Sequence, residues 1–347
     1  MTQPSQQAAP AEKPGASGRA IDVSFIVAAY NAAPFIEAAV RSALAQQDVR
    51  VEVIVVDDAS RDDTAARVAT LAEADDRVRV LRRSSNGGPS AARNMGIEAA
   101  RGAWLAVLDG DDLVTADRSA RLLALAAATS ADIVADNFAR MDAAGRPLGT
   151  YMLAGDPGIY AVSVDAPAFV RGNALFDRHA RLGAIKPMIR TDMLRRLGLR
   201  YREDLHNGED YVLLLEALLA SARFVVSGEP LYLYRVHAGS ISWRIDLDRL
   251  ARLEQVHASL DLSRASGELT SAVEHYVGCL AAARAMTTTV EHAKAGRWSD
   301  ALAMAAGTPR AWPLLGRTLT AAVAKRLSRA LWRPMDTSAA RDARVSR

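Results

Sequence analysis

Four short apolar segments alternate with helical patterns in the first third of the chain, and this alternation constrains the fold more than any other feature. Each segment is rich in β-branched, aromatic or other apolar residues and has the length of a strand. The segments are residues 24–31, 51–56, 78–81 and 104–108. Strands that alternate with helices predict a mostly parallel sheet with right-handed crossovers. We therefore expect an α/β fold, a doubly wound sheet flanked by helices.

Local signals place three helices between these strands. Pro34 precedes apolar residues at helical spacing, and Ser60–Asp63 forms a capping box for a helix that reaches about Leu71. A third helix is expected over about residues 90–100, with Gly102 as its stop before the fourth strand.

Carboxylates follow two of the apolar segments directly. Asp57 and Asp58 come after the second segment, and Asp109-Gly110-Asp111-Asp112 comes after the fourth. Because parallel strands end at the same edge of a sheet, we expect these acids to meet there, where open α/β sheets bind ligands. Carboxylates this dense repel one another without a cation, and they suit Mg²⁺ or Mn²⁺ with phosphate oxygens completing the shell. A solvated Asp-Gly turn is the alternative.

A loop with Asn86, Gly87 and Gly88 opens onto the same edge. Its backbone N–H groups, together with Arg93, are placed to meet an anion. The loop matches neither the P-loop pattern nor the dinucleotide-binding pattern, so a structural turn explains the glycines equally well.

Four motifs in this region occur in a characteristic order. They are Ile26–Asn31, Val55–Ser60, Asn86–Asn94 and Leu108–Asp112. In this order they resemble the nucleotide-sugar-binding half of family 2 glycosyltransferases, over about residues 21–135, and the resemblance implies the GT-A fold. It also implies a donor site with Asp58 at the base and Asp57 beside it, Asp109 and Asp111 at the ribose and the metal, and Tyr30 and Arg93 along the nucleotide pocket.

Residues 132–196 give weaker signals. A strand is expected at 132–136 and a hairpin tip at 142–146, whereas residues 155–196 are rich in proline, glycine and basic side chains. Long irregular segments in compact domains are usually functional loops, so we assign this one to acceptor binding. Lys186 is its best candidate for a phosphate or sugar contact, and an ordinary surface lysine is the alternative.

Glu209 and Asp210 open a strongly apolar helix over residues 211–220. Acids in a first turn also suit the helix macrodipole, which is the structural alternative. The pair resembles the family's site for the catalytic base, and this resemblance implies that the base is Asp210. Sugar transfer to a hydroxyl needs such a base because the hydroxyl must lose its proton. Glu209 is assigned to the acceptor site and is the next candidate for the base. In the closing segment 232–242, His237 is either a metal ligand or a structural histidine.

Charge and cysteine content narrow the function classes. The net charge is +3, but residues 310–347 hold nine Lys and Arg against two Asp, which gives +7 there and −4 for the rest. This distribution disfavours a nucleic-acid-binding domain. A single cysteine, Cys279, excludes an internal disulfide framework and a cysteine-rich zinc site and favours a reducing, cytoplasmic setting.

The ends of the chain differ from its middle. Residues 1–20 are rich in Gln, Pro, Ala and Gly and are expected to be a disordered lead-in, and no run of about 18 apolar residues is present. We expect a catalytic domain over 21–245 and a helical region over 246–347. The last helix, over about residues 315–333, is basic and amphipathic, so it either docks on an anionic membrane surface without crossing it or packs on the catalytic domain.

The pattern as a whole predicts an inverting, metal-dependent transferase that moves a hexose, most simply glucose from UDP-glucose. It looks most like bacterial succinoglycan-type exopolysaccharide glucosyltransferases, which implies an oligosaccharide acceptor on a polyprenyl diphosphate at the cytoplasmic face of the membrane. A nucleotidyltransferase is the enzymatic rival, but residues 28–33 lack its glycine-rich basic loop. An inactive sugar-binding scaffold is the other rival, although Asp58, Asp109, Asp111 and Asp210 are all present.

Overall fold

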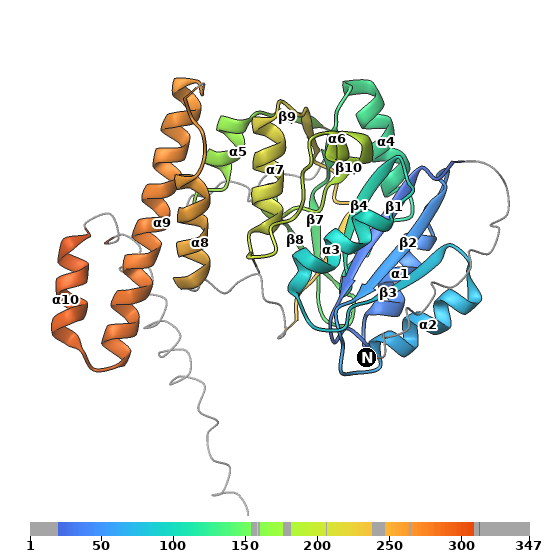
Figure 1. Ribbon diagram of the computed structural model, residues 1–347, viewed down its shortest axis with the longest axis horizontal. Coiled ribbons are helices and arrows are strands. Elements are labelled where there is room, and N and C mark those ends of the chain that lie inside the picture. Colours follow the sequence, from blue (N-terminus) through green and yellow to red (C-terminus); the bar gives the residue numbers. More distant parts are fainter. Residues whose placement is uncertain are drawn as a thin grey trace, which may run out of the picture. The chain divides into compact units, whose positions relative to one another are not determined.

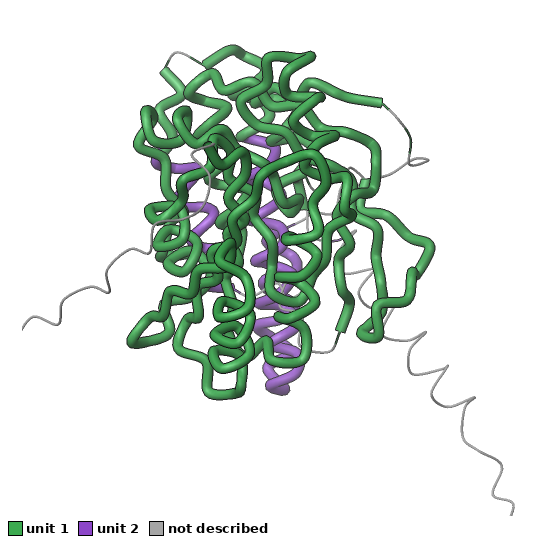
Figure 2. The backbone as a smooth tube through the Cα atoms, turned by 90° about the vertical axis from the view of Figure 1, so that its right-hand side faces the viewer, with its two compact units in different colours: residues 1–244, 260–273 green, residues 245–259, 274–347 purple. Residues whose placement is uncertain are grey.

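The structure is a computed structural model of the chain. It describes residues 20–153, 158, 160–175, 182–205, 207–237, 247–263, 265–308 and 312. The chain forms two compact units, one of residues 1–244 with 260–273 and one of residues 245–259 with 274–347, which Figure 2 shows in separate colours. The expected lead-in over residues 1–20, apart from Ala20, lies outside the described residues, as does the tail from residue 309, apart from Trp312.

The expected parallel strands form one half of the main sheet of the first unit. They are β1 (Val23–Ala29), β2 (Val51–Asp57), β3 (Val78–Arg82) and β4 (Trp104–Asp109), adjacent in the order β3-β2-β1-β4. The helices between them are α1 (Ile36–Leu44), α2 (Thr64–Ala74) and α3 (Gly88–Ala99). The connections through α1 and α2 lead from β1 to β2 and on to β3, whereas the connection through α3 leads in the opposite direction, from β3 to β4. Because each crossover is right-handed, α3 lies on the face of the sheet opposite α1 and α2 (Figure 1).

The other half of this sheet is mixed. Beyond β4 the order continues with β10 (Met188–Arg190), β6 (Ile133–Ala135), β11 (Phe224–Ser227) and β9 (Ala161–Val164), and both β10 and β9 run antiparallel to their neighbours. The expectation of an irregular segment over 155–196 is therefore wrong for most of its described residues. It also holds α5 (Ala166–Gly172), a 3-10 turn η1 (Leu182–Ala184) and α6 (Thr191–Arg196).

A second, smaller sheet begins with a strand that directly follows the turn after β4. In the described residues its order is β5 (Leu113–Val114), β12 (Tyr232–Arg235), β7 (Phe138–Met141) and β8 (Pro147–Tyr151). The expected hairpin tip is confirmed between β7 and β8, where the Asp142 N–H donates to the Arg146 carbonyl at 2.9 Å. Pairing of β12 with β5 carries the segment ending at His237 past the acidic turn after β4.

Two helix boundaries differ from expectation for identifiable reasons. The capping box does not form, because the Ser60 hydroxyl accepts from the Asn31 N–H at 3.0 Å and α2 begins only at Thr64. Gly102 does not cap α3, which ends at Ala99. A side chain at Gly102 would lie 2.5 Å from the backbone nitrogen of Ser24, so close packing of β4 against β1 explains this glycine.

The remaining helices of the first unit flank the main sheet, and the C-terminal region is helical. In the first unit α4 (Arg118–Thr129) contacts β6 and α7 (Glu209–Leu219) contacts α5. The C-terminal helices are α8 (Leu247–Ala258), α9 (Gly267–Lys294) and α10 (Trp298–Gly307), the last two joined through Gly296 at φ +75°. Among the described residues, no helix is both long and apolar enough to span a bilayer.

Candidate active site

The sheet register brings the acids of two strands to one edge. Ala29 of β1 is paired with Asp57 of β2, and Ala28 of β1 is paired with Asp109 of β4. Asp57 and Asp109 therefore flank the end of β1 on either side. Tyr30, the next residue after β1, is 46% exposed at this edge.

Asp58 holds the glycine loop in place. Its carboxylate accepts hydrogen bonds from the N–H groups of Gly87 at 2.9 Å and Gly88 at 2.8 Å, and the Nε of Arg83 lies 2.9 Å away. Asp58 is thus the anion that these amides meet at the start of α3, a favourable position for a carboxylate. Asp57 is fully buried and accepts from the Ser60 N–H at 3.2 Å.

A buried arginine lies at the centre of the site. Arg93 of α3 is 3% exposed and donates to Asp109 at 2.7 Å and to Glu209 at 2.6 Å, and its Nη1 lies 3.4 Å from Asp210. Asp109 ends β4 and the other two acids begin α7, so one guanidinium joins the first half of the domain to the second. Burial opposes the charge of Arg93, but Asp210, Asp109 and Glu209 together raise its pKa well above the usual value.

Lys186 pairs with two of the same acids. Its Nζ lies 2.7 Å from Asp210 and 3.1 Å from Asp109, and the residue is 7% exposed. The alternative of an ordinary surface lysine is therefore wrong. Burial would raise the pKa of Asp109, but Lys186 and Arg93 lower it well below its ordinary value. Asp109 is consequently a fixed negative charge over the whole physiological pH range.

The turn after β4 separates two neighbouring acids. Asp112 is buried and accepts from the Tyr232 hydroxyl at 2.8 Å and the Arg235 N–H at 2.7 Å, so it fixes the turn to β12. Burial, followed by the charges of Asp111 and Asp109, raises its pKa well above the usual value. Asp111 is instead about one-third exposed, and its Oδ2 lies 2.8 Å from Nε2 of His237.

Sequence comparisons identify the family of this chain. The family model described as glycosyl transferase family 2 matches residues 24–180. The chain is 37% identical to succinoglycan biosynthesis protein ExoO of Rhizobium meliloti (strain 1021), over 96% of this chain and 94% of that protein. The chain belongs to glycosyltransferase family 2.

Comparison with solved structures shows that this glycosyltransferase has the GT-A fold. Staphylococcus aureus TarS (residues 1–349, in complex with UDP) aligns with a TM-score of 0.57 at 19% identity, covering 82% of this chain and 90% of that one. The mannosyltransferase PcManGT from Pyrobaculum calidifontis, in complex with GDP-Man and Mn²⁺, aligns with a TM-score of 0.53 at 20% identity, covering 89% and 88%. The expected fold class is thereby confirmed.

Sequence reasoning missed three residues around the site of this family 2 glycosyltransferase. The ring centroid of Tyr201 lies 5.2 Å from the guanidinium carbon of Arg93. Arg118 donates a hydrogen bond to the backbone carbonyl of Lys186 at 2.7 Å. Arg235 donates to the backbone carbonyl of Asp111 at 2.7 Å. Tyr201 and Arg118 stand in segments without a motif. Arg235 adjoins His237 in the closing segment, which was a usable signal.

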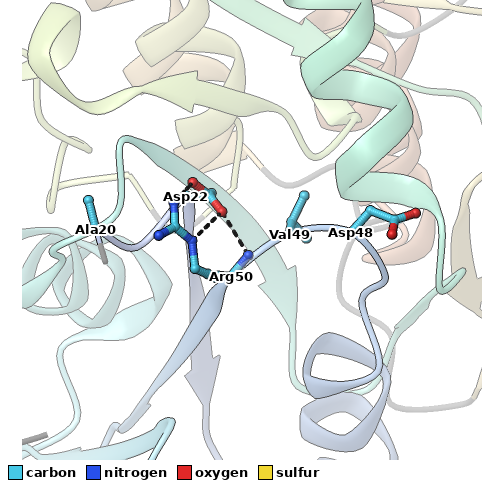
Figure 3. A pocket seen from close by; sticks show the side chains of 5 residues that line it. All are labelled: Ala20, Asp22, Asp48, Val49 and Arg50. Carbon is cyan, nitrogen blue, oxygen red and sulfur yellow. Dashed lines mark hydrogen bonds and ion pairs between the residues drawn. The ribbon is translucent and has the colours of Figure 1, made fainter. Parts of the chain in front are cut away.

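A hollow at the opposite end of the strands contains none of the predicted site residues. It is lined by Ala20, Asp22, Asp48, Val49 and Arg50, which precede β1 and β2 (Figure 3). Arg50 is already paired with Asp22 at 2.8 Å. The acids at the carboxyl edge therefore remain the candidate active site.

Proposed function

We propose that this glycosyltransferase is an inverting, metal-dependent hexosyltransferase that moves glucose from UDP-glucose to a lipid-linked oligosaccharide in exopolysaccharide synthesis. The observation that carries the proposal is the bridging of Asp109 and Asp210 by Arg93 and Lys186. This bridging holds a donor-side acid and an acceptor-side acid next to each other. Transfer in one displacement requires such proximity, because the acceptor hydroxyl must lose its proton as it attacks the anomeric carbon.

Asp210 is the proposed base. It lies at the buried start of α7, where Lys186 and Arg93 fix both of its oxygens. A carboxylate fixed in this way can take the proton of an acceptor hydroxyl as the sugar gains oxocarbenium character. Glu209 and Lys186 are proposed to bind the acceptor beside it.

The donor nucleotide is proposed to lie along the edge formed by Tyr30, Asp57 and Asp58. Arg93 and Asp109 complete this pocket. TarS and PcManGT were solved with UDP and GDP-Man respectively, which supports a nucleotide-sugar donor for a chain of the same fold.

Asp111 and His237 are proposed to hold a divalent cation. One carboxylate and one imidazole converge at 2.8 Å at a partly exposed position, which is a donor set that Mg²⁺ or Mn²⁺ accepts. Within the described residues, no group of three or more His, Cys, Asp and Glu side chains forms a complete metal cage. The remaining ligands would thus be diphosphate oxygens and water, and the bound cation would stabilise the leaving nucleotide diphosphate.

Release of the nucleotide from a panel of donors tests this proposal. Purified protein with a lipid-extract acceptor and Mn²⁺ is expected to release UDP from UDP-glucose faster than from other UDP-hexoses, and to release little GDP from GDP-mannose. Release of pyrophosphate from a nucleoside triphosphate would instead indicate a nucleotidyltransferase. Release from no donor would favour an inactive sugar-binding protein.

Membrane docking is proposed for the C-terminal region. Trp298 and Leu302, one turn apart on α10, are 65% and 71% exposed, and Trp312 is 57% exposed. Residues 310–347, which include Trp312, carry a net charge of +7. Exposed tryptophans beside basic residues suit the interface of an anionic bilayer, where each cation contributes about 1 kcal/mol.

Vesicle sedimentation tests this docking. The full chain is expected to pellet with anionic liposomes and to be released by salt, because the attraction is electrostatic. A chain that ends at Ala311 should remain in solution, and the variant Trp298→Ala/Leu302→Ala should pellet more weakly than the full chain. Equal pelleting of the full and shortened chains, or pelleting of neither, would contradict docking through the tail.

A further inference from the structure

The largest fully buried side chain of the described residues is charged. Arg118, the first residue of α4, has no exposed surface and donates through Nε at 3.0 Å and Nη2 at 2.8 Å to one oxygen of Asp136. Asp136, which follows β6, is also fully buried. Neither residue is among the site residues that the sequence predicted, so the role of this pair must lie in what it touches.

Arg118 contacts the two segments that carry the active-site charges. Its Nη2 donates to the backbone carbonyl of Lys186 at 2.7 Å, and its guanidinium carbon lies 5.5 Å from the ring centroid of Tyr232. The Tyr232 hydroxyl accepts from the Asp109 N–H at 3.2 Å and donates to Asp112 at 2.8 Å. One buried cation therefore supports both the lysine and the acidic turn.

Stabilisation of the fold does not by itself explain this buried ion pair. Removing two charges from water costs about as much as their attraction returns, and apolar residues of similar volume are often equally stable in such a position. In the described part of the chain, Arg118 Nη1 and Asp136 Oδ2 have no hydrogen-bond partner, so desolvation is incompletely compensated. Burial also raises the pKa of Asp136, although Arg118 lowers it.

We propose that the Arg118–Asp136 pair positions the catalytic charges, by fixing the backbone of Lys186 and, through Tyr232, the turn from Asp109 to Asp112. Arg118 is a positioning residue that acts through Lys186. The planar guanidinium is suited to this task because Nε and Nη2 hold Asp136 together while Nη2 also reaches the Lys186 carbonyl. A lysine side chain is one bond shorter than Nη2 and lacks the second donor fixed in the same plane. The inference rests on the proposed function, because it concerns the geometry of that same site.

Two variants test the proposal. Arg118→Met/Asp136→Leu removes both charges and keeps apolar volume, and Arg118→Lys keeps the ion pair but replaces the fork with one nitrogen. We expect both proteins to fold, with kcat at saturating donor reduced by about 10–100-fold and KM for the donor changed less, since loss of alignment acts on the chemical step. Arg121→Met, at an exposed position one turn along α4, is the matched control and should keep the wild-type kcat.

Hydrogen exchange supplies a readout that does not depend on catalysis. Peptides covering residues 184–190 are expected to exchange at least tenfold faster in Arg118→Lys than in the Arg121→Met control. If the double variant does not fold, Arg118→Lys decides the question. Wild-type kcat in a folded Arg118→Lys protein, or unchanged exchange over 184–190, would overturn the positioning role. Absence of nucleotide release from the wild type would instead contradict the proposed function, while the exchange result would still stand on its own.

Discussion

Replacing Asp210 with asparagine is expected to reduce sugar transfer by about 10²–10⁴-fold while donor binding persists, which is the range for loss of a positioned base. Asparagine keeps the size of the side chain and can still accept a hydrogen bond from Lys186, but it cannot take a proton from the acceptor hydroxyl. The measurement is kcat for transfer together with the dissociation constant of UDP-glucose by calorimetry.

Glu209→Gln is the matched control for this change. Glu209 begins the same helix and pairs with Arg93 at 2.6 Å, and it is proposed to bind the acceptor rather than to remove the proton. It should raise KM for the acceptor more than it lowers kcat. An equal loss of donor affinity in Asp210→Asn would make Asp210 a binding residue, and near-normal transfer would move the role of the base to Glu209.

Replacing Asp111 with alanine is expected to abolish turnover and leave the fold intact. The side chain is partly exposed and borders His237, so its removal creates no core cavity but takes away half of the proposed protein ligands. Loss of the cation would remove a transition-state stabilisation of several kcal/mol, about a thousandfold or more in rate. Turnover is measured as UDP release, and folding as the thermal unfolding midpoint.

Metal removal and a surface variant complete this test. Wild-type protein in excess EDTA should lose activity and recover it when Mn²⁺ or Mg²⁺ is added. Asp76→Ala, at an exposed position away from the carboxyl edge, should keep the full rate. Full activity of Asp111→Ala, or of the wild type in EDTA, would show that the metal role is wrong.

The strands and helices of the first half of the domain were predictable because their signals are local. Each of the first four strands is rich in apolar residues, and Asp57 and Asp109 end two of these strands directly after apolar residues. Strand β10 was missed because three residues are too short for a periodic pattern and its neighbours β4 and β6 lie far away in the sequence.

The bridging contacts could not be predicted, since they depend on the tertiary fold. Arg93, Lys186 and Asp210 were each identified separately, but nothing local relates positions 93, 186 and 210 until the sheet places β10 beside β4. Arg118 gave no signal at all, because a buried arginine at a helix start has the same sequence pattern as an exposed one.

We propose that Asp210 and the donor-side acids perform a single displacement at one edge of the sheet. The most direct test is the anomeric configuration of the first product, read from the coupling of its anomeric proton by NMR. From an α-linked UDP-sugar we expect a β-linked product, because one attack on the anomeric carbon inverts it. An α-linked product would require a second displacement or another mechanism and would rule out a single displacement by this enzyme.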